Sequence, residues 1–145
     1  MLPVILLAAA VFAVNLSVQA LAISGLLHLA TPAVRRLVAR HDFWGRAVAL
    51  EVTILVLLMT ILVQVGTWAV VFLWLEEFPD YQTAFYHSAV NFTTLGYGDL
   101  VMSEDVRLLG PLEAVNGSIM LGLSGATLFA AFGVVTGRRR RDGPP

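Results

Sequence analysis

Three long apolar stretches and one short mixed stretch dominate the pattern of hydrophobic and polar positions. The apolar stretches run from about Leu2 to Leu29, from Ala47 to Leu75 and from Leu109 to Thr136. A helix needs roughly 20 mainly apolar residues to cross a bilayer, and each stretch reaches that length. No positive charge precedes the first stretch, which is also too long for a secretory signal peptide. The pattern therefore predicts an all-α membrane protein with three spanning helices.

The residues between the second and third stretches, 76–108, are too polar to span a membrane and too aromatic for an ordinary loop. Asp80 is a favourable helix N-cap, and residues 81–93 then carry apolar side chains at helical spacing. A helix of that length rises only about 20 Å, which is too short to cross. A short helix followed by glycine-rich backbone, with both ends on one side, predicts a re-entrant loop that lines an aqueous path.

Charge is strongly segregated, although the net charge is only -1. Basic residues gather after the first stretch and in the tail: Arg35, Arg36, Arg40, Arg46, Arg138, Arg139, Arg140 and Arg141. Acidic residues gather between the second and third stretches: Glu76, Glu77, Asp80, Asp99, Glu104 and Asp105. Cytoplasmic loops carry an excess of basic residues. The charges therefore predict an integral membrane protein with its amino terminus outside and its carboxyl terminus in the cytoplasm.

Residues 93–99 read Thr-Thr-Leu-Gly-Tyr-Gly-Asp, here called the TTLGYGD segment, and resemble the selectivity filter of potassium channels. The resemblance is to small bacterial pore-domain potassium channels and covers residues 47 to about 136. It implies the potassium-channel pore fold in a bacterial inner membrane, and the hydrophobic pattern adds one extra amino-terminal transmembrane helix. From the pattern and the charges we expect a peripheral transmembrane helix (1–31), a basic cytoplasmic linker (32–46) and a basic cytoplasmic tail (137–145). The resemblance implies that the pore domain (47–136) consists of an outer helix (47–75), an extracellular pore helix and filter (76–108) and an inner helix (109–136).

The glycines of the TTLGYGD segment suit a carbonyl-lined filter. A regular strand alternates the direction of its carbonyls, so a filter needs residues of alternating handedness, and Gly96 and Gly98 take positive φ without a Cβ penalty. The resemblance implies that K⁺ binds the carbonyl oxygens of Thr94, Leu95, Gly96 and Tyr97 and the Thr94 hydroxyl. The motif occurs once in the chain, so a filter of four strands implies a homotetramer.

Other residues are expected to support the filter. The resemblance implies that Asp99 hydrogen-bonds to an aromatic residue of the pore helix, which is Tyr86 in this chain, and that Thr93 and Gly98 flank the ion-binding positions. His87 follows, where the family often has a second aromatic residue. Two interpretations of His87 stay open: a pH-sensitive group at the outer mouth, or an aromatic spacer with a satisfied ring nitrogen, which is favoured.

Leu95 departs from the family pattern, which usually has valine or isoleucine there. Leu95 and Tyr97 are expected to point away from the ions and pack against the pore helix. Overpacking there typically costs about 1–3 kcal/mol, so we hypothesise that Leu95 makes the filter prone to close. Leu95 also raises the alternative of a weakly selective monovalent cation channel.

Other functional classes receive less support. A non-conducting membrane sensor subunit is an alternative to a channel. No acid pair, metal cluster or nucleophile–base arrangement in the spans indicates an enzyme, and no basic–aromatic patch indicates nucleic-acid binding. Apart from K⁺ ions in the filter, no cofactor is expected.

The third stretch carries small residues at every fourth position: Ala114, Ser118, Gly122, Ala126 and Ala130. Such a stripe lets helices approach closely in lipid. The resemblance implies an inner helix that bends at a central glycine, for which Gly122 is the candidate and Gly125 its rival, while a pure packing role stays open. Glu113 and Asn116 are expected to tie this helix to the pore helix.

The first stretch has no repeated arginines, so a peripheral helix without steep voltage gating is expected. Asn15 and Gln19 lie on one face of it and are expected to hydrogen-bond to the pore domain. For the tail arginines, Arg138, Arg139, Arg140 and Arg141, a topology signal is favoured over contact with anionic lipid headgroups.

Overall fold

The computed structural model describes the backbone of residues 1–39 and 43–135 and the side chains of residues 1–28 and 43–133. It contains the helices α1 (Leu2–Ala39), α2 (Phe43–Trp74), α3 (Tyr81–Phe92) and α4 (Leu109–Val135). No strand occurs within these ranges. The predicted all-α fold, with a short helix between two long ones and an extra helix before them, is confirmed.

Three helical segments are long and apolar enough to cross a membrane: Leu2–His28, Phe43–Trp74 and Leu109–Gly133. They match the three predicted spans, and the chain is an integral membrane protein by this length and composition. Two boundaries differ from the expected ones. Helix α1 continues through Ala39, so part of the basic segment expected over 32–46 is helical, and α2 begins at Phe43 rather than Ala47.

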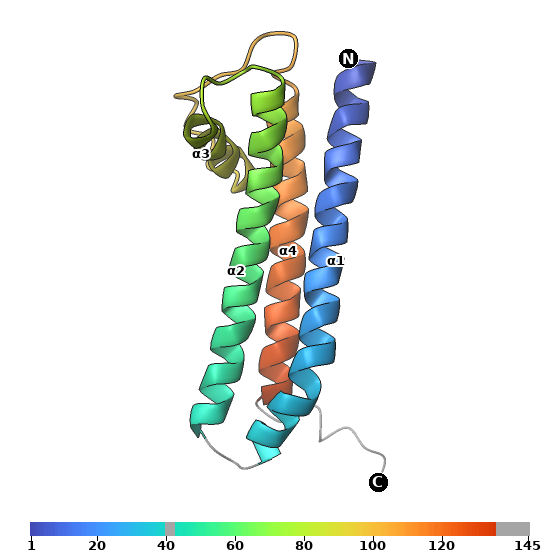
Figure 1. Ribbon diagram of the computed structural model, residues 1–145, viewed down its shortest axis with the longest axis vertical. Coiled ribbons are helices and arrows are strands. Elements are labelled where there is room, and N and C mark those ends of the chain that lie inside the picture. The colour runs from blue at the N-terminus through green and yellow to red at the C-terminus, as the bar shows by residue number, and fades with distance from the viewer. Residues whose placement is uncertain (40–42, 136–145) are drawn as a thin grey trace.

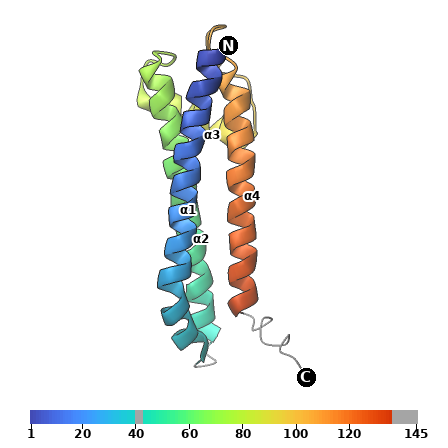
Figure 2. The same ribbon diagram turned by 90° about the vertical axis from the view of Figure 1, so that its right-hand side faces the viewer.

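The three long helices lie side by side, and α3 lies against α2 and α4 near one end of them (Figure 1). Helix α1 contacts both α2 and α4, and the view turned by 90° also shows it running along both (Figure 2). The start of α1, the end of α2, all of α3 and the start of α4 share this end of the molecule, and α4 ends at the opposite one. Both ends of the segment between α2 and α4 are therefore at the same end, as a re-entrant segment requires.

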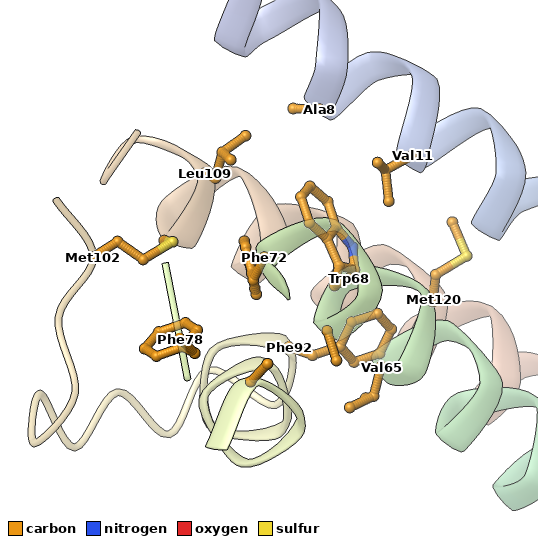
Figure 3. Close-up of a cluster of buried hydrophobic side chains, with 12 residues drawn as sticks. Ala8, Val11, Val65, Trp68, Phe72, Phe78, Phe92, Met102, Leu109 and Met120 are labelled. Carbon is orange, nitrogen blue, oxygen red and sulfur yellow. The ribbon is translucent and has the colours of Figure 1, made fainter. Parts of the chain in front are cut away.

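A hydrophobic core forms where all four helices meet (Figure 3). Trp68 and Phe72 of α2 are fully buried at its centre, with ring centroids 5.8 Å apart. The remaining members come from all four helices and the two connecting segments: Ala8, Val11, Val65, Ala69, Phe78, Ala84, Phe92, Met102, Leu109 and Met120. Burying aromatic side chains of this size stabilises a domain strongly, so this core fixes the position of α3 on the two helices beside it.

The two segments that flank α3 are joined to each other. After α2, Glu76 adopts a left-handed conformation with φ 59, and the amide of Glu77 donates to the Phe72 carbonyl at 3.1 Å, which ends the helix. The carboxylate of Glu77 then accepts hydrogen bonds from the backbone N–H and the hydroxyl of Ser103, both at 2.7 Å. This pair links the α2–α3 connection to the connection that follows the TTLGYGD segment.

Candidate functional site

Helix α3 begins at the predicted cap. Asp80 has extended backbone angles, and its Oδ1 accepts from the Thr83 backbone N–H at 2.9 Å while its Oδ2 accepts from the Thr83 hydroxyl at 2.9 Å. The hydrogen bonds from Thr83, the backbone one first, lower the pKa of the Asp80 carboxyl. The Asp80 side chain therefore supplies an acceptor to a backbone N–H of the first turn, which has no partner within the helix. The predicted cap is confirmed.

The TTLGYGD segment leaves α3 in an alternating backbone conformation. Thr94, Gly96 and Gly98 have φ of 62, 59 and 72, while Leu95 and Tyr97 are not among the described residues with positive φ. The amides of Leu95 and Gly96 both donate to the Val90 carbonyl, at 2.9 and 3.3 Å. Positive φ was expected for the two glycines, and its extension to Thr94 was not. A β-branched residue in this region is a strained outlier of the kind found at functional sites.

The large side chains of this segment are not buried within the chain. Leu95 is 55% exposed and Tyr97 is 65% exposed. The expected packing of both side chains against the pore helix is therefore not achieved by α3 of the same chain. An added Cβ on Gly96 or Gly98 would also meet no neighbour within 4 Å. The described residues of one chain therefore leave this segment largely exposed.

The end of the segment is held to α3. The Tyr86 hydroxyl donates to Oδ2 of Asp99 at 2.7 Å, which is the contact that the resemblance implied. This hydrogen bond raises the pKa of the Tyr86 hydroxyl, because the donor proton is held by the carboxylate. Tyr86 is therefore a neutral donor at neutral pH.

His87 lies behind the segment and faces the core. Only 6% of it is exposed, its Nε2 is 2.8 Å from Nδ2 of Asn91, and its ring lies 4.7 Å from the Phe78 ring and 5.4 Å from the Phe72 ring, between centroids. Burial lowers its pKa, opposed by a hydrogen bond with the Leu100 backbone. These surroundings favour the aromatic spacer with satisfied ring nitrogens over a pH-sensitive group.

Glu113 and Gly117 are two of the residues through which α4 contacts α3. Glu113 is fully buried, and its Oε1 lies 2.5 Å from the Ser88 hydroxyl oxygen, which in turn lies 2.8 Å from the Val65 carbonyl of α2. One turn further, an added Cβ on Gly117 would stand 1.9 Å from the Phe92 carbonyl oxygen. The sequence indicated the link through Glu113, but it gave no sign of Ser88 as its partner or of Gly117 as the point of closest approach.

Asn116 does not tie α4 to α3 as expected, because it faces the other way. Its Oδ1 accepts from the Asn15 amide of α1 at 2.8 Å and from the Trp68 indole N–H of α2 at 3.0 Å. Further from the end that carries α3, the Gln64 amide donates to Oε1 of Gln19 at 3.0 Å. The Gln19 amide in turn donates to the Ser124 hydroxyl of α4 at 3.1 Å. These buried side chains form one polar ladder that joins α1, α2 and α4: Asn15, Gln19, Gln64, Trp68, Asn116 and Ser124.

The stripe of small residues on α4 faces away from the rest of the chain. Ser118, Gly122, Ala126 and Ala130 are exposed. An added Cβ on Gly122 or Gly125 would meet no atom of the chain within 4 Å. Neither glycine is therefore needed for packing within one copy, and both remain hinge candidates. The tail arginines, Arg138, Arg139, Arg140 and Arg141, lie outside the described residues.

Comparison with known proteins adds a family to this geometry. A family model described as "ion channel" matches residues 58–138, more than half of the chain. The matched region takes in the second half of α2 and all of α3, the TTLGYGD segment and α4. No curated protein and no solved structure matches the chain.

Proposed function

Because this chain belongs to the ion channel family, we propose that four copies of it form a potassium-selective channel that conducts K⁺ passively across the membrane. The ions bind the carbonyl oxygens of Thr94, Leu95, Gly96 and Tyr97 and the Thr94 hydroxyl. These ligands are all oxygens, which suits a hard alkali cation that must exchange its hydration shell for protein atoms.

The observation that carries the proposal is the alternating backbone of the TTLGYGD segment. Left-handed residues at Thr94, Gly96 and Gly98 alternate with residues of the opposite hand, which turns successive carbonyls toward one side. An ordinary loop does not require a strained threonine such as Thr94, which follows the end of α3 and precedes two left-handed glycines. A carbonyl-lined ion path does require it.

Helix α3 supports the same function electrostatically. It ends at Phe92, immediately before the segment, and the carboxyl end of a helix carries roughly half a negative charge from its aligned peptide dipoles. A cation beside the TTLGYGD segment is thereby stabilised where the low dielectric of the membrane would otherwise oppose it.

Four copies are proposed because one chain alone does not enclose the ion path. Leu95 and Tyr97 are largely exposed, and so are Ser118, Gly122 and Ala126 of α4. A ring of four chains buries both sets, with the small residues along the axis or between copies.

We place the acidic end of the molecule, with the amino terminus, outside a bacterial inner membrane. The basic segment after the first span and the tail then lie in the cytoplasm, where Arg138, Arg139, Arg140 and Arg141 are available to anionic lipid headgroups at about 1 kcal/mol each.

Ion flux from purified protein in liposomes tests the proposal. Potassium-loaded vesicles should release K⁺ when the protein is present, barium should block the release, and sodium substituted for potassium should give little flux. Gly96→Ala should abolish the flux, because a Cβ in left-handed backbone costs about 1–2 kcal/mol per residue. Gly25→Ala in α1, where an added Cβ meets no atom within 4 Å, is the matched control and should conduct normally.

The alternatives give different results in the same experiment. Equal flux of sodium and potassium, with a reversal potential that does not change when sodium replaces potassium, identifies a weakly selective cation channel. Assembled protein without any flux identifies a non-conducting sensor subunit.

A further inference from the structure

The Ser88 hydroxyl has more acceptors than it has protons. Its oxygen lies 2.8 Å from the Val65 carbonyl oxygen and 2.5 Å from Oε1 of Glu113. A hydroxyl carries a single proton, and the Val65 carbonyl has none to give. If Ser88 donates to Val65, the short contact with Glu113 needs a proton from the carboxyl itself.

Burial of Glu113 points the same way. None of its surface is exposed, and its Oε2 is buried with no hydrogen-bond partner. An ionised carboxylate without a counter-charge is very costly to bury, and such a group takes up a proton instead. In a neutral acid, Oε2 is an ordinary carbonyl oxygen, for which a missing partner costs much less.

We propose that Glu113 is a protonated carboxylic acid. Its O–H donates to Ser88, and Ser88 donates to the Val65 carbonyl, so that a chain of two hydrogen bonds joins α4, α3 and α2. Glu113 thereby acts as a positioning residue that holds α3 behind the TTLGYGD segment. The location of the proton is independent of the proposed potassium selectivity, but its effect on ion flux rests on the proposed channel function.

No described group near Glu113 supplies a compensating charge. Among the described side chains of α1 and α2, the titratable ones are His28, Arg46 and Glu51. His28 comes late in α1 and the other two early in α2, whereas the start of α1, the end of α2 and the start of α4 share the end of the molecule that carries Glu113. The only ion pair among the described side chains joins Arg107 to Glu104 at 3.8 Å, and both of these are exposed.

The remaining titratable neighbours are on α3. Tyr86 is a neutral donor to Asp99, Tyr81 lies against Gly66 of α2, and His87 has its Nε2 beside the Asn91 amide. The Asn91 amide beside His87 brings no positive charge either. Within the described residues, a proton is therefore what neutralises Glu113.

Infrared difference spectroscopy on the assembled protein in lipid locates this proton directly. A protonated carboxyl has a C=O stretch separate from the carboxylate bands, and an ordinary glutamate, with a pKa near 4.3, has lost it at pH 7. We expect this acid band in the unmodified protein at pH 7, its loss in Glu113→Gln, and a shift of its frequency in Ser88→Ala, where the acceptor is gone. An unmodified protein without the band, or a band that survives Glu113→Gln unchanged, overturns the proposal.

Flux measurements on the same samples test the positioning role. Glu113→Gln has the same shape and still donates an N–H to Ser88, so its K⁺ flux should stay close to that of the unmodified protein. Glu113→Ala removes both the bridge and its volume, and should lower the flux by roughly tenfold. Equal flux in the Ala and unmodified proteins overturns the positioning role. If neither conducts, the proposed function fails while the spectrum still decides where the proton is.

Discussion

The hydroxyl of Tyr86 holds Asp99, at the end of the TTLGYGD segment, to α3. It donates to Asp99 at 2.7 Å, and Tyr86→Phe removes it without changing the ring. We expect several-fold lower K⁺ flux, because the end of the segment is then free to leave the conducting arrangement. Flux through liposomes reports this directly.

The pH dependence of the Tyr86 contact supplies an internal check. The raised pKa of Tyr86 means that the donor is fully present below the ordinary tyrosine pKa of about 10 and is lost only as the pH rises through the raised value. The difference between the unmodified protein and Tyr86→Phe should therefore stay constant across the neutral range and shrink only in strong alkali. Equal flux in the two proteins at neutral pH would show that the contact does not hold the segment.

Among the described glycines, Gly117 is the one at which an added Cβ would stand closest to another atom. In Gly117→Ala the new Cβ would lie 1.9 Å from the Phe92 carbonyl oxygen and 2.7 Å from its carbon, so the backbone of α3 or α4 must move. Overpacking of this kind typically costs about 1–3 kcal/mol. We expect a lower thermal midpoint by circular dichroism in detergent, together with loss of flux, whereas Gly25→Ala should leave both unchanged. An unchanged midpoint in Gly117→Ala contradicts the close approach of the two helices.

At the scale of helices, the sequence predicts what composition and local chemistry determine. Three apolar runs predict the spans, and Asp80 predicts the start of α3, because length and capping depend only on neighbouring residues. The partners of Glu113 and Asn116 depend instead on how each helix is rotated about its axis, which local sequence does not specify. That rotation sends Glu113 toward Ser88 on α3 and Asn116, three positions later, toward α1 and α2.

Within the TTLGYGD segment, the same distinction applies residue by residue. The positive φ of Gly96 and Gly98 is predictable because glycine is the residue that tolerates it. The positive φ of Thr94 is not, because threonine disfavours that region and adopts it only where the hydrogen bonds to the Val90 carbonyl and the adjoining helix end over-determine the backbone.

The polar ladder makes α1 an integral part of the helix bundle, and a double-mutant cycle measures how strongly. Asn15 and Asn116 are both fully buried and joined at 2.8 Å. Hydrogen bonds between membrane helices contribute about 0.6 kcal/mol on average and up to about 1.7. We expect Asn15→Ala and Asn116→Ala to destabilise the protein non-additively, with a coupling free energy in that range, measured by reversible unfolding in mixed micelles.

Ser17→Ala is the matched control for this cycle. Ser17 lies on the same helix, but it is exposed and bonds only to the Ala13 carbonyl. Its combination with Asn116→Ala should be additive within about 0.5 kcal/mol. A coupling of zero between Asn15 and Asn116 would mean that their hydrogen bond does not help to hold α1 in the bundle.

At the scale of the whole molecule, the proposed conducting path needs more than one chain. The alternating backbone is built within one chain, but this chain leaves Leu95 and Tyr97 55% and 65% exposed, and the proposed tetramer would cover them. An ion that binds between four such segments binds the assembled state and not the separated chains. It must therefore stabilise the assembly by mass action, by about 2.7 kcal/mol when its concentration is a hundred times its dissociation constant.

This linkage predicts that potassium raises the temperature at which the proposed tetramer dissociates. We expect the dissociation temperature, read from the fraction of tetramer after heating in detergent, to rise with K⁺ concentration and to change little with Na⁺ at the same ionic strength. Gly96→Ala, which strains the left-handed backbone of the ion path, should lose the K⁺ dependence, and Gly25→Ala should keep it. Equal stabilisation by K⁺ and Na⁺ would show that the bound ion occupies a site without selectivity. A chain that stays monomeric with either ion would contradict the four-fold ion path, because a single copy cannot surround a dehydrated ion with ligands from four sides.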